Sequence, residues 1–229
     1  MSESSTRTAL LDLAQDLAQT RGFNAFSYQD LAAGIGIRTA SIHHHFPTKA
    51  DLGREVMARY REQFRGYLEA IETHTPSGRP RLEEFAELFR NTLRKGNRLC
   101  LCGMLAAEFA TLPASVRREV KRFYEETETW LARILDEGRA AKDFSYTGSS
   151  APVARAYFAT LEGAMIAART FDDESRLARA AQWFLSSLEG RSIAASSRPR
   201  STAKAPPARP SLSRTLKSTR PRFPKRRKS

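Results

Sequence analysis

The stretch GFNAFSYQDLAAGIGIRTASIHHHFPTKADL, residues 22–52, decides the fold of the N-terminal part of the chain. Ser27 followed by Asp30 has the spacing of a capping box, which predicts a short helix over about residues 28–34. Gly36 then supplies the positive φ that a tight turn needs. A second short helix follows, so the stretch predicts a helix-turn-helix, in which the second helix enters the major groove of DNA with its N-terminal residues leading.

Three adjacent histidines, His43, His44 and His45, lie in this second helix, which we expect over about residues 38–45. Successive residues of a helix are rotated by about 100°, so the three imidazoles point in widely separated directions. Metal ligands on one helix need a spacing of three or four residues to reach one ion. We therefore expect neither a metal site nor a cofactor.

A DNA-recognition helix would use these residues differently. Its DNA-facing side chains would be Arg38, Thr39, Ser41, His43 and His44, and its inward-facing neighbours Ile35, Ile37, Ile42 and Phe46. Lys49, near the start of the next helix, lies where a cation and free backbone N–H groups can hold a phosphate. Periodicity alone leaves a second interpretation open, a small helical core with a polar surface.

The rest of the chain also has helical periodicity, without an alternating strand pattern. The helix that follows Pro47 has one apolar stripe, made of Leu52, Val56, Tyr60, Phe64, Tyr67, Leu68 and Ile71. Further helical segments end in two alanine-rich helices over about residues 152–170 and 174–189. The pattern predicts an all-α fold, with a helix-turn-helix domain over residues 1–52 and a second helical domain over residues 53–189.

The positive charge is concentrated at the C-terminus. Residues 190–229 hold 13 of the 38 basic residues and no acidic residue, so the preceding part has 38 − 13 = 25 Lys and Arg against 25 Asp and Glu. The net charge of +13 therefore comes from this segment, which is rich in Pro, Ser and Arg. We expect it to be a disordered basic tail that is attracted to phosphates without sequence preference.

Composition argues against several other classes. No apolar run reaches the roughly 20 residues of a membrane span, and the N-terminus lacks the features of a signal peptide. Two cysteines, Cys100 and Cys102, do not indicate a secreted disulfide framework. No His–acid pair can be placed near Cys100, and AGIG alone is not a phosphate-binding loop. We expect a cytosolic protein that is not an enzyme and does not associate with a membrane.

The segments GFNAFSYQDLAAGIGI and TASIHHHFPTKADL are identified as those of the TetR/AcrR family of bacterial one-component regulators. The family pattern is roughly G-x-x-x-T/S-x-x-x-I/L-A-x-x-A-G-V-S-x-G-T/S-L/I-Y-x-H/Y-F-x-x-K-x-x-L. The resemblance implies that Ser27 and Tyr28 approach the DNA backbone and that Lys49 clamps a phosphate. It also implies that Arg38, Thr39, Ser41, His43 and His44, the DNA-facing set, contact the operator. His43 replaces the usual Tyr and Ala40 the common Gly, so the base preference cannot be transferred.

The same resemblance implies that the second domain binds an effector and forms a homodimer through its last two helices. Aromatic and sulfur-containing residues of the central helices are candidate linings of the effector pocket: Phe85, Phe89, Phe109, Phe123, Trp130, Tyr157 and Met165. Each is also a natural core residue. Small residues in the last two helices suit a dimer interface, although packing within one chain explains them nearly as well.

The segment NRLCLCGMLAAEFATLP resembles the electrophile- and redox-responsive subgroup of the family, the regulators of N-ethylmaleimide reductase type, in which a cysteine matching Cys100 is the sensor. A thiol at a helix start beside Arg98 would have a depressed pKa. Alternatively, Cys100 and Cys102 are small apolar residues of a core helix.

These features favour a homodimeric transcriptional repressor, located with the bacterial nucleoid in the cytoplasm. A small molecule, electrophilic in the subgroup named above, would release it from a near-palindromic DNA operator. The alternative is an architectural DNA-binding protein dominated by its basic tail, which would bind all sequences alike.

Overall fold

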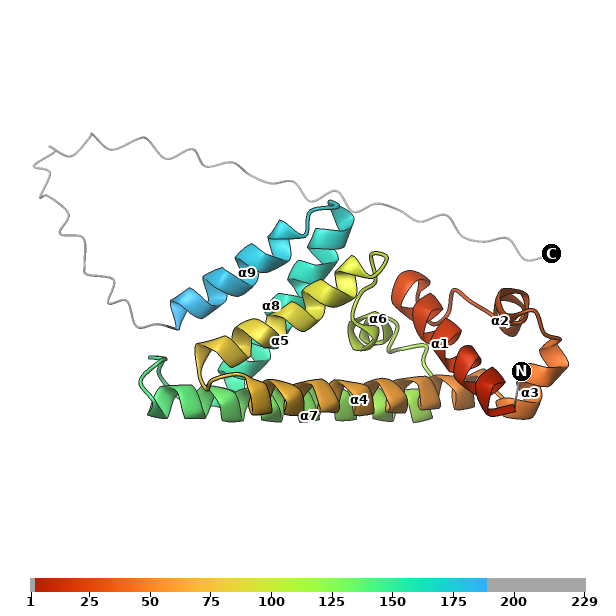
Figure 1. The fold of residues 1–229 in the computed structure, drawn as a ribbon, viewed down its shortest axis with the longest axis horizontal. Coiled ribbons are helices and arrows are strands. Elements are labelled where there is room, and N and C mark those ends of the chain that lie inside the picture. The colour runs from red at the N-terminus through yellow and green to blue at the C-terminus, as the bar shows by residue number, and fades with distance from the viewer. Residues whose placement is uncertain (1–2, 189–229) are drawn as a thin grey trace, which may run out of the picture. The chain divides into compact units, whose positions relative to one another are not determined.

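The computed structural model describes residues 3–188, and this part of the chain folds into nine helices (Figure 1). They are α1 (Glu3–Arg21), α2 (Tyr28–Ile35), α3 (Thr39–His45), α4 (Lys49–His74), α5 (Arg79–Arg94), α6 (Leu101–Ala107), α7 (Ala114–Ala140), α8 (Ser150–Thr170) and α9 (Ser175–Ser187). The predicted all-α fold is confirmed for these residues. The expected basic tail, residues 190–229, lies outside the described part.

The first helix joins the helix-turn-helix to the rest of the fold. Leu10, Ala14 and Leu17 recur at helical spacing along α1 and are buried. The helix ends at Arg21, and Gly22 follows with a φ of 101°, a conformation that glycine adopts without steric cost. Because α1 packs against α2, α4 and α6, it contacts both the DNA-binding motif and the second helical group.

The long helix α4 runs through the boundary that the sequence suggested after residue 52. Thr48 caps its N-terminus, and the apolar stripe on one face is buried except at its two tyrosines. Tyr67 is 52% exposed and lines a cavity, whereas Tyr60 is partly buried, with its ring 5.6 Å from that of Phe123 in the core and one edge on the same cavity. Residues Met1–Ser192 form one compact unit, so the two predicted domains share this helix.

Aromatic side chains fill the core of the second helical group. Helix α4 packs against α7, α7 against α8, and α8 against α9, while α5 contacts α4, α7, α8 and α9 (Figure 1). Phe85 of α5 lies at the centre, with its ring stacked 5.6 Å from Trp130 and edge-on 6.3 Å from Phe158. Rings packed at these distances contribute beyond the burial of their area.

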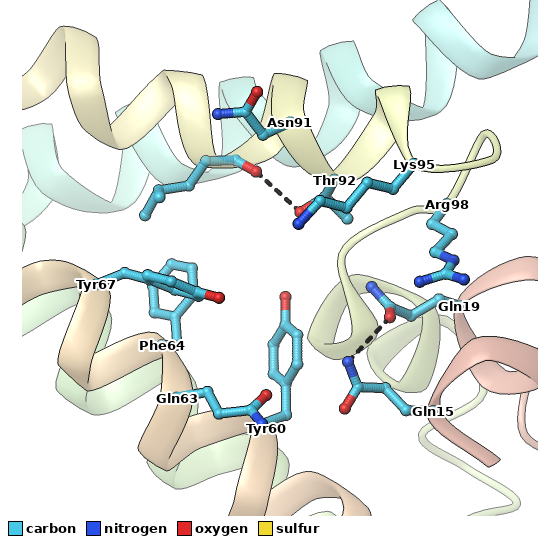
Figure 2. A pocket seen from close by; sticks show the side chains of 11 residues that line it. Gln15, Gln19, Tyr60, Gln63, Phe64, Tyr67, Asn91, Thr92, Lys95 and Arg98 are labelled. Atoms are coloured by element: carbon cyan, nitrogen blue, oxygen red, sulfur yellow. Dashed lines mark hydrogen bonds between the residues drawn. The ribbon is translucent and has the colours of Figure 1, made fainter. Parts of the chain in front are cut away.

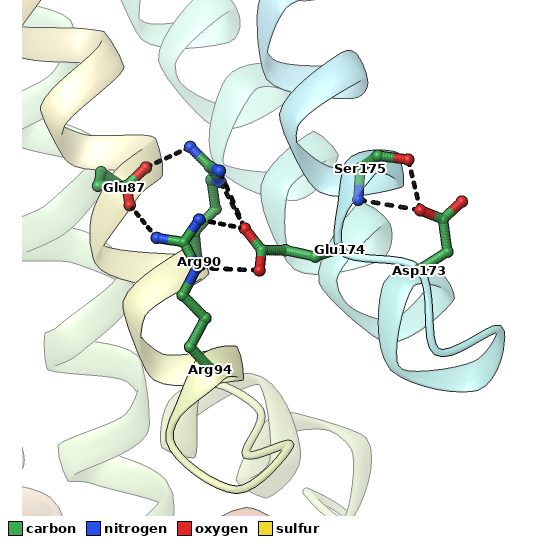
Figure 3. Close-up of polar contacts among 6 residues, drawn as sticks. All are labelled: Glu87, Arg90, Arg94, Asp173, Glu174 and Ser175. Atoms are coloured by element: carbon green, nitrogen blue, oxygen red, sulfur yellow. Dashed lines mark hydrogen bonds and ion pairs between the residues drawn. The ribbon is translucent and has the colours of Figure 1, made fainter.

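An ion-pair cluster fastens α5 to the turn between α8 and α9 (Figure 3). Arg90 and Arg94 both contact Glu174, with Arg90 Nη2 2.9 Å from Oε1 and Arg94 Nε 2.9 Å from Oε2. Both arginines also reach Glu87 on α5, which is one turn from Arg90 and two turns from Arg94. The hydrogen bond from Arg94 is the main cause that lowers the pKa of Glu174, so this carboxylate stays ionised at neutral pH.

Among residues 3–188, no helix is both long enough and apolar enough to cross a membrane.

Candidate nucleic-acid interface and central cavity

The local sequence builds the turn between α2 and α3 as predicted. Ser27 Oγ accepts a hydrogen bond from the Asp30 backbone N–H, and the Ser27 N–H donates to Asp30 Oδ2 at 2.7 Å, which completes a capping box. At the other end of α2, Gly36 has a φ of 77° and its N–H bonds to Ala32 O. Ser27 and Gly36 therefore set the start and the end of α2, as the sequence predicted.

The second helix of the motif, α3, has a buried face and an exposed face. Ile42 and Phe46 are fully buried and anchor α3 to the three-helix core. The DNA-facing set is on the other side: Arg38, Ser41, His43 and His44 are exposed and Thr39 is partly exposed. Arg38, which we expected to be the first residue of this helix, is instead its N-cap, one position before α3 begins. The geometry brings this whole set to one short, polar helix surface.

Tyr28 has an internal contact that the family resemblance did not imply. Its hydroxyl donates to the backbone oxygen of Phe46 at 2.9 Å, and its ring lies 4.8 Å from that of His43. Burial is the main cause that raises the pKa of Tyr28 to about 12. Tyr28 therefore holds the end of α3 against the start of α2, and His43 rests on it.

Lys49 has a different position from that of the predicted phosphate clamp. Its ammonium donates to the backbone oxygens of Phe23, at 2.6 Å, and Phe26, and it lies over both phenylalanine rings. Burial lowers the pKa of Lys49, opposed by the charge of Glu108. The ammonium caps the carbonyl groups of the loop between α1 and α2, because those carbonyls have no partner within a helix.

Three contacts tie this loop and α1 to the region around α6. Glu108, at the C-terminus of α6, accepts hydrogen bonds from the backbone N–H groups of Phe23 (2.7 Å) and Asn24. The side chain of Gln19 donates to Leu99 O at 2.8 Å, and Leu99 N–H donates to Gln19 O. These hydrogen bonds couple the position of α1 and the loop after it to that of α6.

A cavity of about 270 Å³ lies between α1, α4 and α5 (Figure 2). Its lining residues are Gln15, Gln19, Tyr60, Gln63, Phe64, Tyr67, Leu88, Asn91, Thr92, Lys95 and Arg98. The tyrosine hydroxyls and the Lys95 ammonium point into the space between the helices (Figure 2). Sequence reasoning missed every one of these residues as pocket linings. The one available signal was the polar pair Gln15 and Gln19, spaced by one turn on α1.

All but one of the residues predicted to line an effector pocket belong to the core; the exception is Phe109, which is partly buried with Arg117 and Lys121 over its ring. Phe89 is 2% exposed and lies 5.4 Å from the Phe85 ring, so it does not reach the cavity. Trp130 is 8% exposed and, with Phe123, borders a groove on the α4–α7 side that is separate from the cavity. Phe85, Phe123, Tyr157 and Met165 are also buried in the core.

The expectation of a depressed pKa for Cys100 is wrong. The thiol is buried, and burial together with the nearby Glu162 carboxylate raises the pKa of Cys100 well above its ordinary value. Arg98 does not oppose this effect, since its guanidinium pairs with Asp16 at 2.6 Å. The pKa of Cys102 is raised in the same way. Both cysteines are protonated, weakly nucleophilic core residues in this structure.

A helix-turn-helix with an exposed polar recognition helix, continuous with a helical domain that encloses a cavity, defines a DNA-binding transcriptional regulator. Comparison with known families agrees. The family described as bacterial regulatory proteins, tetR family, matches residues 10–56, and the family described as Tetracyclin repressor-like, C-terminal domain, matches residues 78–184. The chain belongs to the TetR family, whose members are not enzymes.

Individual relatives give the same assignment. A TetR transcriptional regulator from Legionella pneumophila is 30% identical, with a TM-score of 0.70 over 79% of this chain and 95% of that chain. A TetR-family regulator from Agrobacterium tumefaciens is 29% identical, with a TM-score of 0.79 over 82% and 99%. The HTH-type transcriptional repressor KstR2 of Rhodococcus jostii (strain RHA1) is 32% identical over 81 residues, 35% of this chain and 40% of that protein.

The expected subgroup is supported at the level of the fold alone. The reduced form of Escherichia coli NemR is similar with a TM-score of 0.69, over 78% of this chain and 95% of that chain, at 22% sequence identity. An identity this low does not carry the role of an individual cysteine from one chain to the other.

Proposed function

We propose that the protein is a homodimeric repressor in the bacterial cytoplasm that binds a near-palindromic operator and leaves it when a small molecule binds. The observation that carries this proposal is the polar, exposed face of α3, held by the buried Ile42 and Phe46. A relative named as a transcriptional repressor, KstR2, supports negative rather than positive regulation.

The recognition helix would enter the major groove with Arg38, Thr39 and Ser41 leading, followed by the two exposed histidines His43 and His44. Ser27, at the start of α2, lies where backbone contacts position such a motif on DNA. Loss of a base contact costs about 1–3 kcal/mol and relaxes specificity at one position. Arg38→Ala is therefore expected to weaken operator binding more than binding to random DNA.

An exposed face on α8 and α9 supports the homodimer. Ile166 is 51% exposed and Trp183 is 73% exposed, and the small residues Ala156, Ala159 and Gly163 on α8 are exposed as well. Large apolar side chains open to solvent, next to small ones that allow close approach, suit helix packing against a second copy. A two-fold dimer would place the two α3 helices about 34 Å apart, one turn of DNA.

The release step is proposed to be non-covalent. The raised pKa and burial of Cys100 favour reversible binding of an effector over reaction with an electrophile. An effector changes the operator affinity only if it binds two conformations with different affinity, and about 1–3 kcal/mol is the usual size of such coupling. The helix α1, which contacts both the recognition motif and α6, is the element we expect to move.

Competition binding tests the proposal. The purified protein is titrated against its own upstream DNA and against scrambled DNA of equal length, at two salt concentrations. Preference for the upstream DNA by about 10³ or more at the higher salt supports a site-specific regulator. Equal binding to both DNAs that collapses with salt would favour the architectural alternative, in which the basic tail dominates.

A further inference from the structure

We infer that the cavity between α1, α4 and α5 binds a small aromatic carboxylate. The inference rests on the proposed function, because it names the chemical class of the effector that this regulator would sense.

The charge of the cavity wall favours an anion. The lining residues include two cations, Lys95 and Arg98, and no acidic residue. Arg98 is already paired with Asp16, whereas Lys95 makes no ion pair with any side chain of residues 3–188. The Lys95 ammonium points into the cavity (Figure 2). A carboxylate there would form a charge-assisted hydrogen bond with a solvent-exposed ammonium that no carboxylate of residues 3–188 pairs with.

The opposite wall favours an aromatic body. Tyr60, Phe64 and Tyr67 follow one another along α4 and present rings to the cavity, and Leu88 adds an aliphatic surface from α5. Flat rings stack well on such a wall. A volume of about 270 Å³ lies just below the range of about 300–1,000 Å³ that holds drug-sized ligands, which favours a compound with one ring.

The cavity also touches the elements that carry a signal to DNA. Gln15 and Gln19 belong to α1, and Gln15 Nε2 donates to Gln19 Oε1 at 3.3 Å. Gln19 in turn holds Leu99, next to the start of α6. The Tyr60 hydroxyl donates to Cys100 Sγ at 3.6 Å, on the same segment. A ligand seated here contacts α1 and α4 at once, so its binding shifts the helix that supports the recognition motif.

Calorimetric titration of the full chain, without DNA, tests the inference. The probes are benzoate and cinnamate with their neutral counterparts benzamide and cinnamamide, which have nearly the same shape. The variants are Lys95→Gln and, as a matched control, Lys121→Gln, an exposed lysine of α7 outside the cavity. We expect the carboxylates to bind about tenfold more tightly than the amides, and Lys95→Gln to remove that advantage.

Three outcomes would overturn the inference: no saturable binding by any probe, equal binding of carboxylates and amides, or an unchanged preference in Lys95→Gln. Thermal melting of Lys95→Gln shows whether the variant folds, and the amide affinities show whether the cavity is intact. Binding through Lys95 in a protein without operator preference would leave the cavity assignment standing and defeat the proposed function. Operator preference without carboxylate binding would support the proposed function and defeat the cavity assignment.

Discussion

Replacing Lys49 with methionine tests whether this lysine stabilises the fold or binds a DNA phosphate. Methionine keeps a long apolar side chain between the rings of Phe23 and Phe26 and removes the ammonium that bonds to their two carbonyl groups. Because Lys49 is the one donor to these two carbonyls among residues 3–188, the substitution leaves both without a protein partner.

The size of the effect follows from these contacts. A hydrogen bond from a charged group contributes about 1.5–3 kcal/mol, and two are lost. The desolvation of the Lys49 ammonium, which lowers its pKa, already offsets part of the free energy that these hydrogen bonds contribute. The site is half-buried, so water can reach the two carbonyl groups after substitution and reduce the loss further. We expect a net loss of about 2 kcal/mol in the free energy of unfolding, which lowers the Tm of a domain of this size by about 4–8 °C.

The assay combines thermal melting with the salt dependence of DNA binding, measured below the Tm of the variant. We expect the lower Tm together with an unchanged salt slope, and no change in either quantity for the exposed control Lys121→Met. A wild-type Tm with a salt slope reduced by about one would mean that Lys49 contacts a phosphate in the complex, and the structural role argued here would be refuted.

Three further predictions follow from other sites. Burial raises the pKa of Glu162 to about 7, so the folded state binds this proton more tightly than the unfolded state does. The free energy of unfolding of the wild type should therefore fall by up to about 3 kcal/mol as the pH rises from 5 to 8. Glu162→Gln should show a flatter dependence of stability on pH, and parallel profiles for the two proteins would contradict the prediction. Trp183→Arg places a charge on the exposed face of α9 that we propose as the dimer interface. The substitution should shift the protein from dimer to monomer in analytical ultracentrifugation and weaken operator binding. An unchanged dimer would place the interface elsewhere. Gly36→Ala should lower the free energy of unfolding, measured by chemical denaturation, by about 1–2 kcal/mol, since the φ of 77° at this position strains any residue with a Cβ. No atom lies within 4 Å of the new methyl group, so the loss would come from the backbone alone, and a neutral effect would argue against this turn geometry.

The helix-turn-helix was predictable because its determinants are local. Ser27 and Asp30 are three residues apart, Gly36 permits the turn, and Ile42 and Phe46 have helical spacing. Each of these signals acts within one or two turns of the backbone, where capping and steric rules hold whatever the rest of the fold does. The exposed polar face of α3 followed from the same periodicity.

The roles of charged and reactive side chains were harder to predict. The sequence places Arg98 two residues from Cys100, which suggested a stabilised thiolate, but Arg98 turns to Asp16 on α1 and Glu162 of α8 lies beside the thiol. Lys49 likewise meets carbonyl groups from the loop before α2 rather than open solvent. A pKa depends on burial and on charges brought from distant segments, and neither is written in the local sequence.

The amino-acid sequence alone therefore determined the all-α fold, the recognition helix and the family, because repeated apolar spacing, caps and turn glycines act at short range. Only the tertiary structure decided which residues surround the cavity, since α1, α4 and α5 contribute them from positions as far apart as Gln15 and Arg98. It also decided that the aromatic residues of α5 and α7 fill the core. Lys95 and the rings of Tyr60 and Tyr67 line one cavity only because long-range packing brings their segments together.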